Sequence, residues 1–234
     1  MKATPDEIRA RFDRDVERFS TLETGQATAV DSPLHLELIA EAAAALTRRA
    51  RALLDVGCGA GNYALKLLEK LPRMDVTLLD LSRPMLDRAA ERVATATAGR
   101  VETVQSDVRA ADLGEGRFDV IVAASVFHHL RADAEWEAVF GKAHRALRPG
   151  GSFWISDHIA QASPEVQALM WRRWGEYLVG LKGEAYRDQV FAYTEYEDTP
   201  RPLTDQLDLL RAVGFGRLEV LHKNGLFAAF GAVK

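Results

Sequence analysis

The stretch that decides the fold is Ala52-Leu53-Leu54-Asp55-Val56-Gly57-Cys58-Gly59-Ala60-Gly61-Asn62, in which a short apolar run leads into a glycine-rich loop. The run Ala52–Val56 predicts a buried strand, and the apolar spacing of Asn62–Leu71 after the loop predicts a helix. A glycine loop at this point lets a ligand approach the backbone N–H groups of the helix N-terminus. The stretch therefore predicts the first strand-loop-helix unit of an α/β sheet, with a ligand site at its edge.

Apolar runs and amphipathic segments continue to alternate after this loop. The predicted strands cover 74–79, 101–105, 118–124 and 152–156, and the predicted helices cover 82–97 and 133–147. The second of these helices stops at Arg148-Pro149-Gly150-Gly151, where proline and glycine end the pattern. This alternation predicts a parallel sheet with helices packed on both of its faces.

Two segments outside the alternation are predicted to flank the sheet. Near the N-terminus, Thr4-Pro5-Asp6-Glu7 has the pattern of a capping box, and Ser32-Pro33 begins a second helix. Later in the chain, Ala160–Pro202 holds seven of the 19 aromatic residues and four of the five tyrosines, without strand character. We interpret the first segment as a helical lid and the second as a cap inserted in the sheet.

One more helix and two alternating runs complete the predicted domain. The helix covers Thr204–Val213, and the runs Arg217–Lys223 and Leu226–Val233 flank Asn224-Gly225, the strongest short-range signal for a hairpin. The parallel sheet is therefore predicted to end in an antiparallel hairpin strand. We expect a single domain with four parts: an N-terminal helical lid (1–50), a cofactor-binding core (51–159), a substrate cap (160–202), and a final helix and hairpin (203–234).

The composition of the 234 residues is that of an ordinary globular protein, with 47% hydrophobic and 27% charged residues. The formal net charge of −4 gives no long-range attraction to nucleic acid or to an anionic membrane. Cys58 is the only cysteine and the N-terminal residues lack the apolar region of a signal peptide, so we expect a cytoplasmic location. The longest apolar stretch, Val120–Phe127, is too short to span a bilayer. We expect a small-molecule partner, and the oligomeric state stays open.

Three acidic residues fall where successive predicted strands end. Asp55 precedes the first glycine by two residues, Asp80 ends the second strand, and Asp107 with Val108 follows the third. Open α/β sheets bind ligands at this edge, where an acid can hydrogen-bond a ribose diol. The loop spacing G-x-G-x-G is one residue shorter than the dinucleotide fingerprint, and a carboxylate beside it suits a cationic ligand better than a pyrophosphate. Taken alone, Asp80 is also compatible with a helix cap and Asp107 with a turn, although the ligand site is the favoured interpretation.

Five segments together resemble the motifs of class I S-adenosylmethionine-dependent methyltransferases. In chain order they are Leu54–Gly61, Leu79–Leu86, Gln105–Val108, Phe118–Leu130 and Leu147–Gly151, and the resemblance extends over residues 51–234. It implies an α/β, Rossmann-like three-layer sandwich whose seven-stranded, mostly parallel sheet has a reversed last strand. It also implies S-adenosylmethionine as cofactor and S-adenosylhomocysteine as product.

The resemblance also assigns parts of the cofactor to particular residues. Asp55 and the glycine loop are expected to hold the methionine part, Asp80 the ribose, and Asp107 with Val108 the adenine. The full set expected at the cofactor is Asp55, Gly57, Cys58, Gly59, Gly61, Asp80, Leu81, Met85, Asp107, Val108 and Ala124.

The reacting end of the site is expected among the polar residues after the fourth and fifth strands, His128, His129, Asp157 and His158. His129 is the candidate general base, although histidines that pack the loop or face solvent are an equally good interpretation. Adjacent His-His and Asp-His pairs tend to diverge, so no metal site is predicted. The residues expected to face the substrate are His128, His158, Tyr186, Tyr193 and Arg187.

The favoured activity is direct in-line transfer of a methyl group to a nucleophile of a small molecule, an EC 2.1.1 reaction. A looser resemblance, in Phe12–Phe19 and Leu210–Phe215, to carboxy-S-adenosylmethionine synthase gives a second interpretation. That enzyme needs an arginine at the new carboxylate, for which Arg187 and Arg201 of the cap are candidates. A third interpretation is a non-catalytic domain that binds the cofactor as a sensor or partner subunit.

Overall fold

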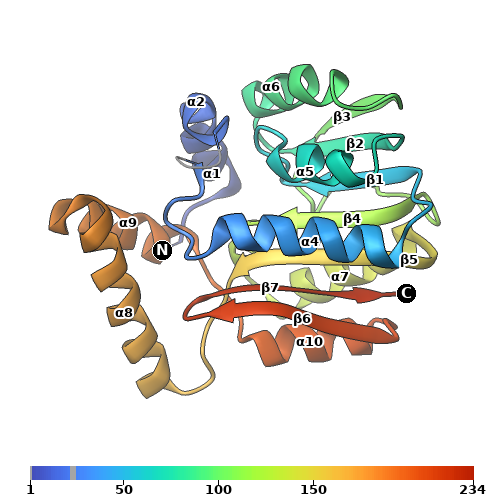
Figure 1. Ribbon diagram of the computed structural model, residues 1–234. Helices are drawn as coiled ribbons and strands as arrows, with labels where there is room; N and C mark the ends of the chain where they lie inside the picture. The colour runs from blue at the N-terminus through green and yellow to red at the C-terminus, as the bar shows by residue number, and fades with distance from the viewer. Residues whose placement is uncertain (1, 22–24) are drawn as a thin grey trace.

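The computed structural model describes residues 2–21 and 25–234, which contain a seven-stranded sheet of strand order β3-β2-β1-β4-β5-β7-β6 (Figure 1). The strands are β1 (Ala52–Val56), β2 (Asp75–Asp80), β3 (Val101–Gln105), β4 (Phe118–Ala124), β5 (Leu147–His158), β6 (Arg217–Asn224) and β7 (Phe227–Val233). Strands β1 to β5 run parallel, whereas β7 is antiparallel to both of its neighbours, β5 and β6. The predicted sheet with one reversed strand is thereby confirmed.

Helices cover both faces of this sheet, which makes the three predicted layers. One face carries α4 (Ser32–Leu46), α5 (Asn62–Lys70) and α6 (Arg83–Ala94), and the other carries α7 (Asp133–Ala146) and α10 (Leu203–Ala212). Successive side chains of β1 point to opposite faces, so Leu53 packs in the core under α4 to α6 and Leu54 in the core under α7 and α10. Both leucines are fully buried, because a parallel sheet is covered on each side.

The C-terminal hairpin turns one residue later than the sequence pattern predicts. Asn224 pairs with Phe227, so the two central residues of the turn are Gly225 and Leu226 rather than Asn224 and Gly225. Gly225 has φ +55°, a left-handed conformation that suits the first central position of a tight hairpin turn and that glycine adopts without strain. Leu226 is buried in a small apolar cluster under the cap, which its place in the turn allows.

The N-terminal helices and the cap lie at the same edge of the sheet, beside the carboxyl ends of the parallel strands (Figure 1). The N-terminal helices are α1 (Pro5–Phe12), which begins at the predicted capping box, and α2 (Val16–Phe19), which follows a short break. The cap consists of α8 (Pro164–Lys182) and α9 (Glu184–Glu197). Its two ends meet where the Ala160 N–H donates to the carbonyl of Arg201 over 3.1 Å.

Direct hydrogen bonds join the N-terminal segment to the cap. The Ala3 N–H donates to the carbonyl of Tyr196 over 3.0 Å, and Nε of Arg11 donates to Oε1 of Glu197 over 2.7 Å. Glu197 is buried, so the charge of Arg11 compensates a carboxylate that water cannot solvate. In the described part of the chain, none of the helices has the length and apolar character needed to cross a membrane.

Candidate active site

A cavity of about 220 Å³ lies at the carboxyl ends of the parallel strands, between the N-terminal helices and the cap. Among the described residues, every residue expected at the cofactor lines it except Gly61. His128, His129, His158 and Tyr193 line the same cavity. The side chains that the sequence places after five separate strands therefore surround one space.

Glycine is required where the loop after β1 approaches the loop after β4. Gly57 has φ +61°, and a Cβ atom there would lie 2.3 Å from Cγ2 of Val126. Gly61, with φ +84°, forms the N-cap of α5, and a Cβ atom there would lie 3.3 Å from Cβ of Ala89 on α6. Gly57 thus shapes the cavity wall, whereas Gly61 allows two helices to pack closely.

The carboxylates of Asp55 and Asp80 are held by backbone N–H groups. Oδ2 of Asp80 accepts from Gly59 and Oδ1 accepts from Ser82, each over 2.8 Å. Oδ2 of Asp55 accepts from Ala64, in the first turn of α5, over 3.1 Å. Burial raises the pKa of both carboxyls, and that of Asp55 reaches about 8 although the bond from Ala64 opposes the shift. Two buried acids of this kind suit a ligand that brings positive charge and hydroxyl donors.

Asp107, just beyond β3, is paired with Arg109. Nε of Arg109 donates to Oδ1 of Asp107 over 2.9 Å, and Nη2 donates to Oδ2 over 2.5 Å. Burial favours the neutral acid, but these bonds outweigh it and hold the pKa of Asp107 below its usual range. An ionised carboxylate next to the backbone of Val108 therefore lines the cavity where an amino group and a ring nitrogen of a purine could bind.

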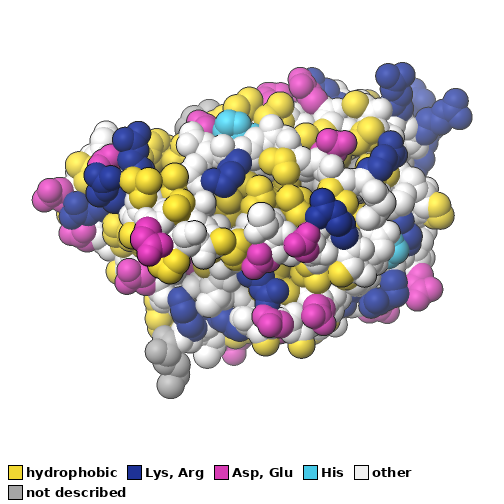
Figure 2. Space-filling view, turned by 90° about the horizontal axis from the view of Figure 1, so that it is seen from below, with side chains coloured by type: hydrophobic (Ala, Val, Ile, Leu, Met, Phe, Trp, Pro, Cys, Tyr) yellow, Lys and Arg dark blue, Asp and Glu magenta, His cyan; other side chains and the backbone are white. Residues whose placement is uncertain are grey.

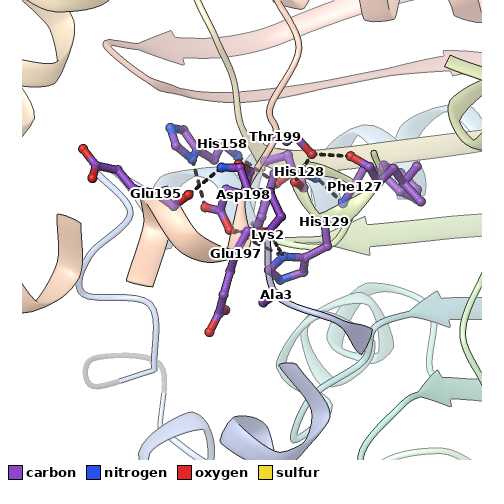
Figure 3. A network of polar contacts seen from close by, with 12 residues as sticks. Lys2, Ala3, Phe127, His128, His129, His158, Glu195, Glu197, Asp198 and Thr199 are labelled. Atoms are coloured by element: carbon purple, nitrogen blue, oxygen red, sulfur yellow. Dashed lines mark hydrogen bonds and ion pairs between the residues drawn. The ribbon is translucent and has the colours of Figure 1, made fainter. Parts of the chain in front are cut away.

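Three histidines surround one carboxylate beyond the ends of β4 and β5 (Figure 3). The carboxylate is that of Asp198, which directly follows α9. Its Oδ1 lies 3.4 Å from Nδ1 of His129 and 3.7 Å from Nε2 of His128, and its Oδ2 lies 3.3 Å from Nδ1 of His158. The cap thus contributes the carboxylate at the centre of the cluster, whereas His128 and His129 come from a 3-10 helix after β4 and His158 from the end of β5.

A second carboxylate fixes His128 from its other ring nitrogen. Nδ1 of His128 hydrogen-bonds Oδ1 of Asp157, whose Oδ2 accepts the N–H of Phe127 over 2.8 Å. Burial disfavours a charge on His128, but the carboxylates of Asp198 and Asp157 outweigh burial and raise the pKa to about 9. At neutral pH His128 is therefore a cation between two carboxylates.

His129 has the opposite protonation behaviour. Burial, and then the neighbouring charge of His128, lower the pKa of His129 to about 3. Burial alone would raise the pKa of Asp198, but His128 and the other two histidines lower it to about 2. A neutral histidine therefore lies against an ionised carboxylate.

His129 and His158 each keep one ring nitrogen without a partner. The Nδ1 atoms of both rings face Asp198, whereas their Nε2 atoms are buried and have no hydrogen-bond partner among the described residues. An ionised carboxylate and a carbonyl can only accept, so Nδ1 of the neutral His129 ring, which also lies 3.3 Å from the carbonyl oxygen of Glu197, carries the proton and its Nε2 keeps the lone pair. Nε2 of His129 is therefore a buried hydrogen-bond acceptor without a partner among the described residues.

The cluster also contains three potential metal ligands. One ligand atom each of His128, His129 and Asp198 lie within 4.8 Å of one another. Adjacent histidines are expected to diverge, but the rings of His128 and His129 lie 4.2 Å apart because both meet the carboxylate that the cap contributes. Hydrogen bonds and ion pairs between these imidazoles and the carboxylates of Asp157 and Asp198 are sufficient to explain why the ligand atoms lie together.

Two residues expected to face the substrate lie elsewhere in the cap. Nε of Arg187 donates to Oδ1 of Asp188 over 2.8 Å, on the exposed side of α9. The ring of Tyr186 lies 5.2 Å from Nζ of Lys182. Neither Arg187 nor Tyr186 is among the described residues that line the cavity.

Arg201, the other candidate for binding a carboxylated cofactor, is also turned away. It pairs with Asp133 and lies over the ring of Trp136, with its Cζ atom 5.0 Å from the ring centroid. The arginines that line the cavity in the described part of the chain are Arg11, Arg18 and Arg109.

Several residues that reach the site from distant segments were not predicted from the sequence. Asp198 comes from the end of the cap, and Phe12 comes from α1. Trp174 and Phe227 also line the cavity, with ring centroids 5.7 Å and 5.6 Å from that of His158. An acid after a helix and single aromatic residues give no signal of their own, because only the tertiary fold brings them to the motif residues.

Comparison with known proteins points to one class. Residues 53–151 match the family model described as a methyltransferase domain. The ubiquinone/menaquinone biosynthesis C-methyltransferase UbiE of Cereibacter sphaeroides is 25% identical over 173 residues, which cover 72% of this chain and 68% of the relative. The carboxy-S-adenosyl-L-methionine synthase of Nautilia profundicola is 25% identical over 191 residues, which cover 78% of this chain and 76% of the relative.

Solved structures of methyltransferases share the fold. An O-methyltransferase family protein from Burkholderia thailandensis aligns with a TM-score of 0.69 and 18% identity, over 99% of this chain and 63% of that one. The 1,6-didemethyltoxoflavin-N1-methyltransferase of the same organism, solved with 1,6-didemethyltoxoflavin and S-adenosylhomocysteine, aligns with a TM-score of 0.63 and 22% identity, over 100% and 92% of the two chains. The chain thus spans less than two thirds of the first structure and most of the second.

The matched methyltransferase domain, the relatives and the shared fold support a class I S-adenosylmethionine-dependent methyltransferase with S-adenosylmethionine as its cofactor.

Proposed function

We propose that the protein transfers a methyl group to a small molecule bound beside the cofactor. The observation that carries this proposal is the order of polar groups along one edge of the sheet. The strand order brings together Asp107 beyond β3, Asp80 at the end of β2 and Asp55 near the end of β1. His129, beyond β4, and His158, at the end of β5, come next. The three acids suit the adenine, ribose and methionine parts of the cofactor, which leaves the histidines for the acceptor.

When bound, the cofactor supplies an electrophilic methyl group on a sulfonium ion. The buried carboxyls of Asp55 and Asp80 suit its positive charge and its ribose, and Asp107 suits its adenine. The remaining contribution of the chain is to orient the acceptor and to exclude water, for which Phe12, Phe19 and Trp174 line the cavity. Orientation is the main requirement of an in-line displacement.

His129 is the proton acceptor in this proposal. Its Nε2 is buried and unprotonated at neutral pH, and Asp198 on its other nitrogen partly opposes burial and the charge of His128, which hold its pKa at about 3. His128 cannot take this role, because it already carries both ring protons between Asp157 and Asp198. No metal ion takes part, so EDTA is expected to leave the rate unchanged.

A small acceptor fits the surface charge better than a nucleic acid. Figure 2 shows Lys and Arg side chains interspersed with Asp and Glu side chains over one face, and the net charge of the chain is −4. A protein that binds nucleic acid through phosphates needs a basic stripe and loses affinity steeply with salt.

The test is the formation of S-adenosylhomocysteine from S-adenosylmethionine with a panel of phenols, heteroaromatic N–H compounds and amines, followed by mass spectrometry. Product that forms only with an acceptor present, at rates that change little with salt or EDTA, supports the proposal. Tight binding of the cofactor with no product from any acceptor would contradict it and favour a sensor or partner subunit.

A carboxy-S-adenosylmethionine synthase is the second candidate. The relative with that activity covers 78% of this chain, which favours it. Against it, Arg187 and Arg201 pair with acids outside the cavity, and Arg11 is engaged by Glu197. Mass spectrometry of a ligand that co-purifies distinguishes the two activities, since only the synthase would yield a cofactor heavier by one carboxylate group.

A further inference from the structure

We propose that Lys142 of α7 is a positioning residue for the cofactor: it holds the loop after β3, residues 106–111, in the conformation in which Asp107 and Val108 select adenine over hypoxanthine. The inference rests on the proposed function, because it takes Asp107 and Val108 as the adenine subsite.

Lys142 gives its hydrogen bonds to the backbone of the loop 106–111. Its Nζ atom donates to the carbonyl oxygens of Val108 over 2.9 Å, Arg109 over 3.1 Å and Ala111 over 2.6 Å. An ammonium group has three N–H donors and no acceptor, so these bonds use its whole hydrogen-bonding capacity. Ordering a long side chain opposes such an arrangement, and three bonds from a charged donor offset that loss of conformational freedom. Lys142 is therefore a fixed anchor of the loop.

The loop depends on such an anchor because its strand lies at the edge of the sheet. Strand β3 is the terminal strand of the described sheet, and none of its five residues is buried, whereas four of the five residues of β1 are. The Ser106 N–H donates to the carbonyl of Asp80 over 3.0 Å, so the first residue of the loop is tied to β2. Lys142 ties down the residues that follow.

The anchored residues form a single turn that fixes the backbone at the cavity. The carbonyl of Asp107 accepts from the N–H groups of Ala110 and Ala111, each over 2.9 Å. Because the carbonyl and the N–H of a trans peptide point in opposite directions, these bonds direct the N–H of Val108 away from the turn. Lys142 binds carbonyls of the same turn and so keeps it from unwinding. Asp107 and Val108, the first residues of the turn, both line the cavity.

A second residue of α7 supports the side chain of Asp107. Nε and Nη2 of Arg109 bind the carboxylate of Asp107, and Nη1 of Arg109 donates to Oε1 of Glu135 over 3.1 Å. Glu135 and Lys142 are two helical turns apart, so they lie on one face of α7. Burial favours the neutral form of Asp107, but its bonds with Arg109 and then the charge of Lys142 lower its pKa. One face of α7 thus sets the backbone, the side chain and the charge of this subsite.

The arrangement of donor and acceptor explains the choice of base. Adenine presents an amino group beside a ring nitrogen that accepts, whereas hypoxanthine presents a carbonyl beside a ring N–H. The ionised carboxylate of Asp107 accepts and the N–H of Val108 donates, which matches adenine and opposes hypoxanthine at both positions. This selection requires the two groups to stay at a fixed separation and direction, and that depends on the turn that Lys142 holds.

The test compares the Kd of S-adenosylhomocysteine with that of S-inosylhomocysteine, by calorimetry. We expect the wild type to bind the adenine compound about 100-fold more tightly, as the loss of two hydrogen bonds, one of them to a charged group, implies. In Lys142→Met, which keeps an unbranched side chain but has no donor, this ratio should fall to about tenfold or less. Urea unfolding of the same variants measures stability separately.

The matched control is Lys234→Met. Nζ of Lys234 also donates to backbone carbonyls, those of His144 over 2.7 Å and Leu147 over 2.8 Å, at the start of β5 and therefore at the end opposite the cavity. Loss of these bonds should leave the ratio of the two Kd values unchanged. If Lys142→Met does not fold, Lys142→Gln, whose side chain is shorter and uncharged, repeats the measurement.

The outcomes separate this proposal from the proposed function. A ratio in the folded Lys142 variants equal to that of the wild type, whatever their stability, would overturn the proposal and leave Lys142 a purely structural residue. Equal affinity of the wild type for the two compounds would also overturn it, because no selection for adenine would exist. Failure of the wild type to bind S-adenosylhomocysteine would instead contradict the assigned cofactor and with it the proposed function.

Discussion

The two halves of the cavity are built in different ways. In the cofactor half, the loops at the strand ends hold the acids: Asp80 accepts from Ser82, two residues away, and from Gly59 in the neighbouring loop after β1, and Asp107 is held by Arg109, two residues away. In the acceptor half, the contacts join distant segments. His128 meets Asp157 over 29 residues of chain, and His158 meets Asp198 over 40.

The difference shows which half of the cavity depends on the position of the cap. Local turns at the strand ends hold the cofactor half whatever happens in the cap, because their hydrogen bonds do not depend on it. The acceptor half exists only while the cap places Asp198 between the histidines. Substitutions in the two halves should therefore separate cofactor affinity from turnover and from pH-dependent stability.

The largest expected effect is on cofactor binding, in Asp80→Asn. The amide keeps the size of the side chain but removes the charged acceptor for the ribose diol, so the Kd for S-adenosylhomocysteine should rise about 100-fold or more, as the loss of two hydrogen bonds to a charged group implies. Calorimetry gives the Kd directly. Asp198→Asn is the counterpart in the acceptor half and should change that Kd less than threefold. Equal effects of the two substitutions on the Kd would contradict the division of the cavity into two independent halves.

His129→Ala should have the opposite effect, with a large loss of turnover and little change in cofactor affinity. Loss of the proton acceptor is expected to lower kcat about 100-fold, the lower range for a general base, while the Kd for S-adenosylhomocysteine stays within threefold. Steady-state rates with the best acceptor measure the first quantity and calorimetry the second. His144→Ala, at a histidine that packs against Phe215 away from the cavity, is the control. Unchanged turnover in His129→Ala would remove the role of this residue.

Asp198→Asn should change how stability depends on pH. The pKa of His128 is raised from 6.5 to about 9 in the folded state, so its contribution to stability is fully present below about pH 6.5 and is lost as pH rises through 9. The wild type should therefore lose on the order of 3 kcal/mol of unfolding free energy across this range from His128 alone. Without the carboxylate of Asp198, most of that loss should disappear.

Urea unfolding at a series of pH values measures this dependence. Asp55 acts in the same direction, because its pKa is raised to about 8 and the stability it contributes at low pH is lost as pH rises through that value. Asp55→Asn removes the contribution of this carboxyl to the pH dependence of stability and serves as the comparison from the cofactor half. A pH profile of Asp198→Asn that parallels the wild type would show that Asp198 does not hold the charge on His128.

The smallest expected effect is a proton released when the ligand binds. At pH 7 the carboxyl of Asp55 is mostly protonated in the empty cavity, and the ammonium group of S-adenosylhomocysteine should favour the ionised form. Binding enthalpies in buffers of different ionisation enthalpy should then reveal the release of up to one proton per site. Asp55→Asn should remove this buffer dependence, and its absence in the wild type would place the amino group elsewhere.

Most of the fold could be read from the sequence because it depends on local patterns. The strands over 101–105 and 118–124 have the bounds that the apolar runs predict. The hairpin is displaced by one residue because Leu226 is buried under the cap, a tertiary contact that a turn pattern cannot contain.

The site divides in the same way. The acids and glycines after β1 to β3 could be found because strand ends of a parallel sheet meet at one edge. Asp198 could not, since an acid after a helix is common and nothing in the sequence of the cap says which side of the sheet it will meet. Arg187 and Tyr186 were expected in the cavity from their chemistry, but the orientation of α9 puts both elsewhere.

A structure of the complex with S-adenosylhomocysteine tests the division of the cavity most directly. We expect the adenine beside Asp107, the ribose hydroxyls on Asp80, and the sulfur directed toward His129, with the space between His129 and His158 left for the acceptor. A ligand that lies across the ends of β4 and β5, with its ribose or adenine against the histidines, would contradict the account.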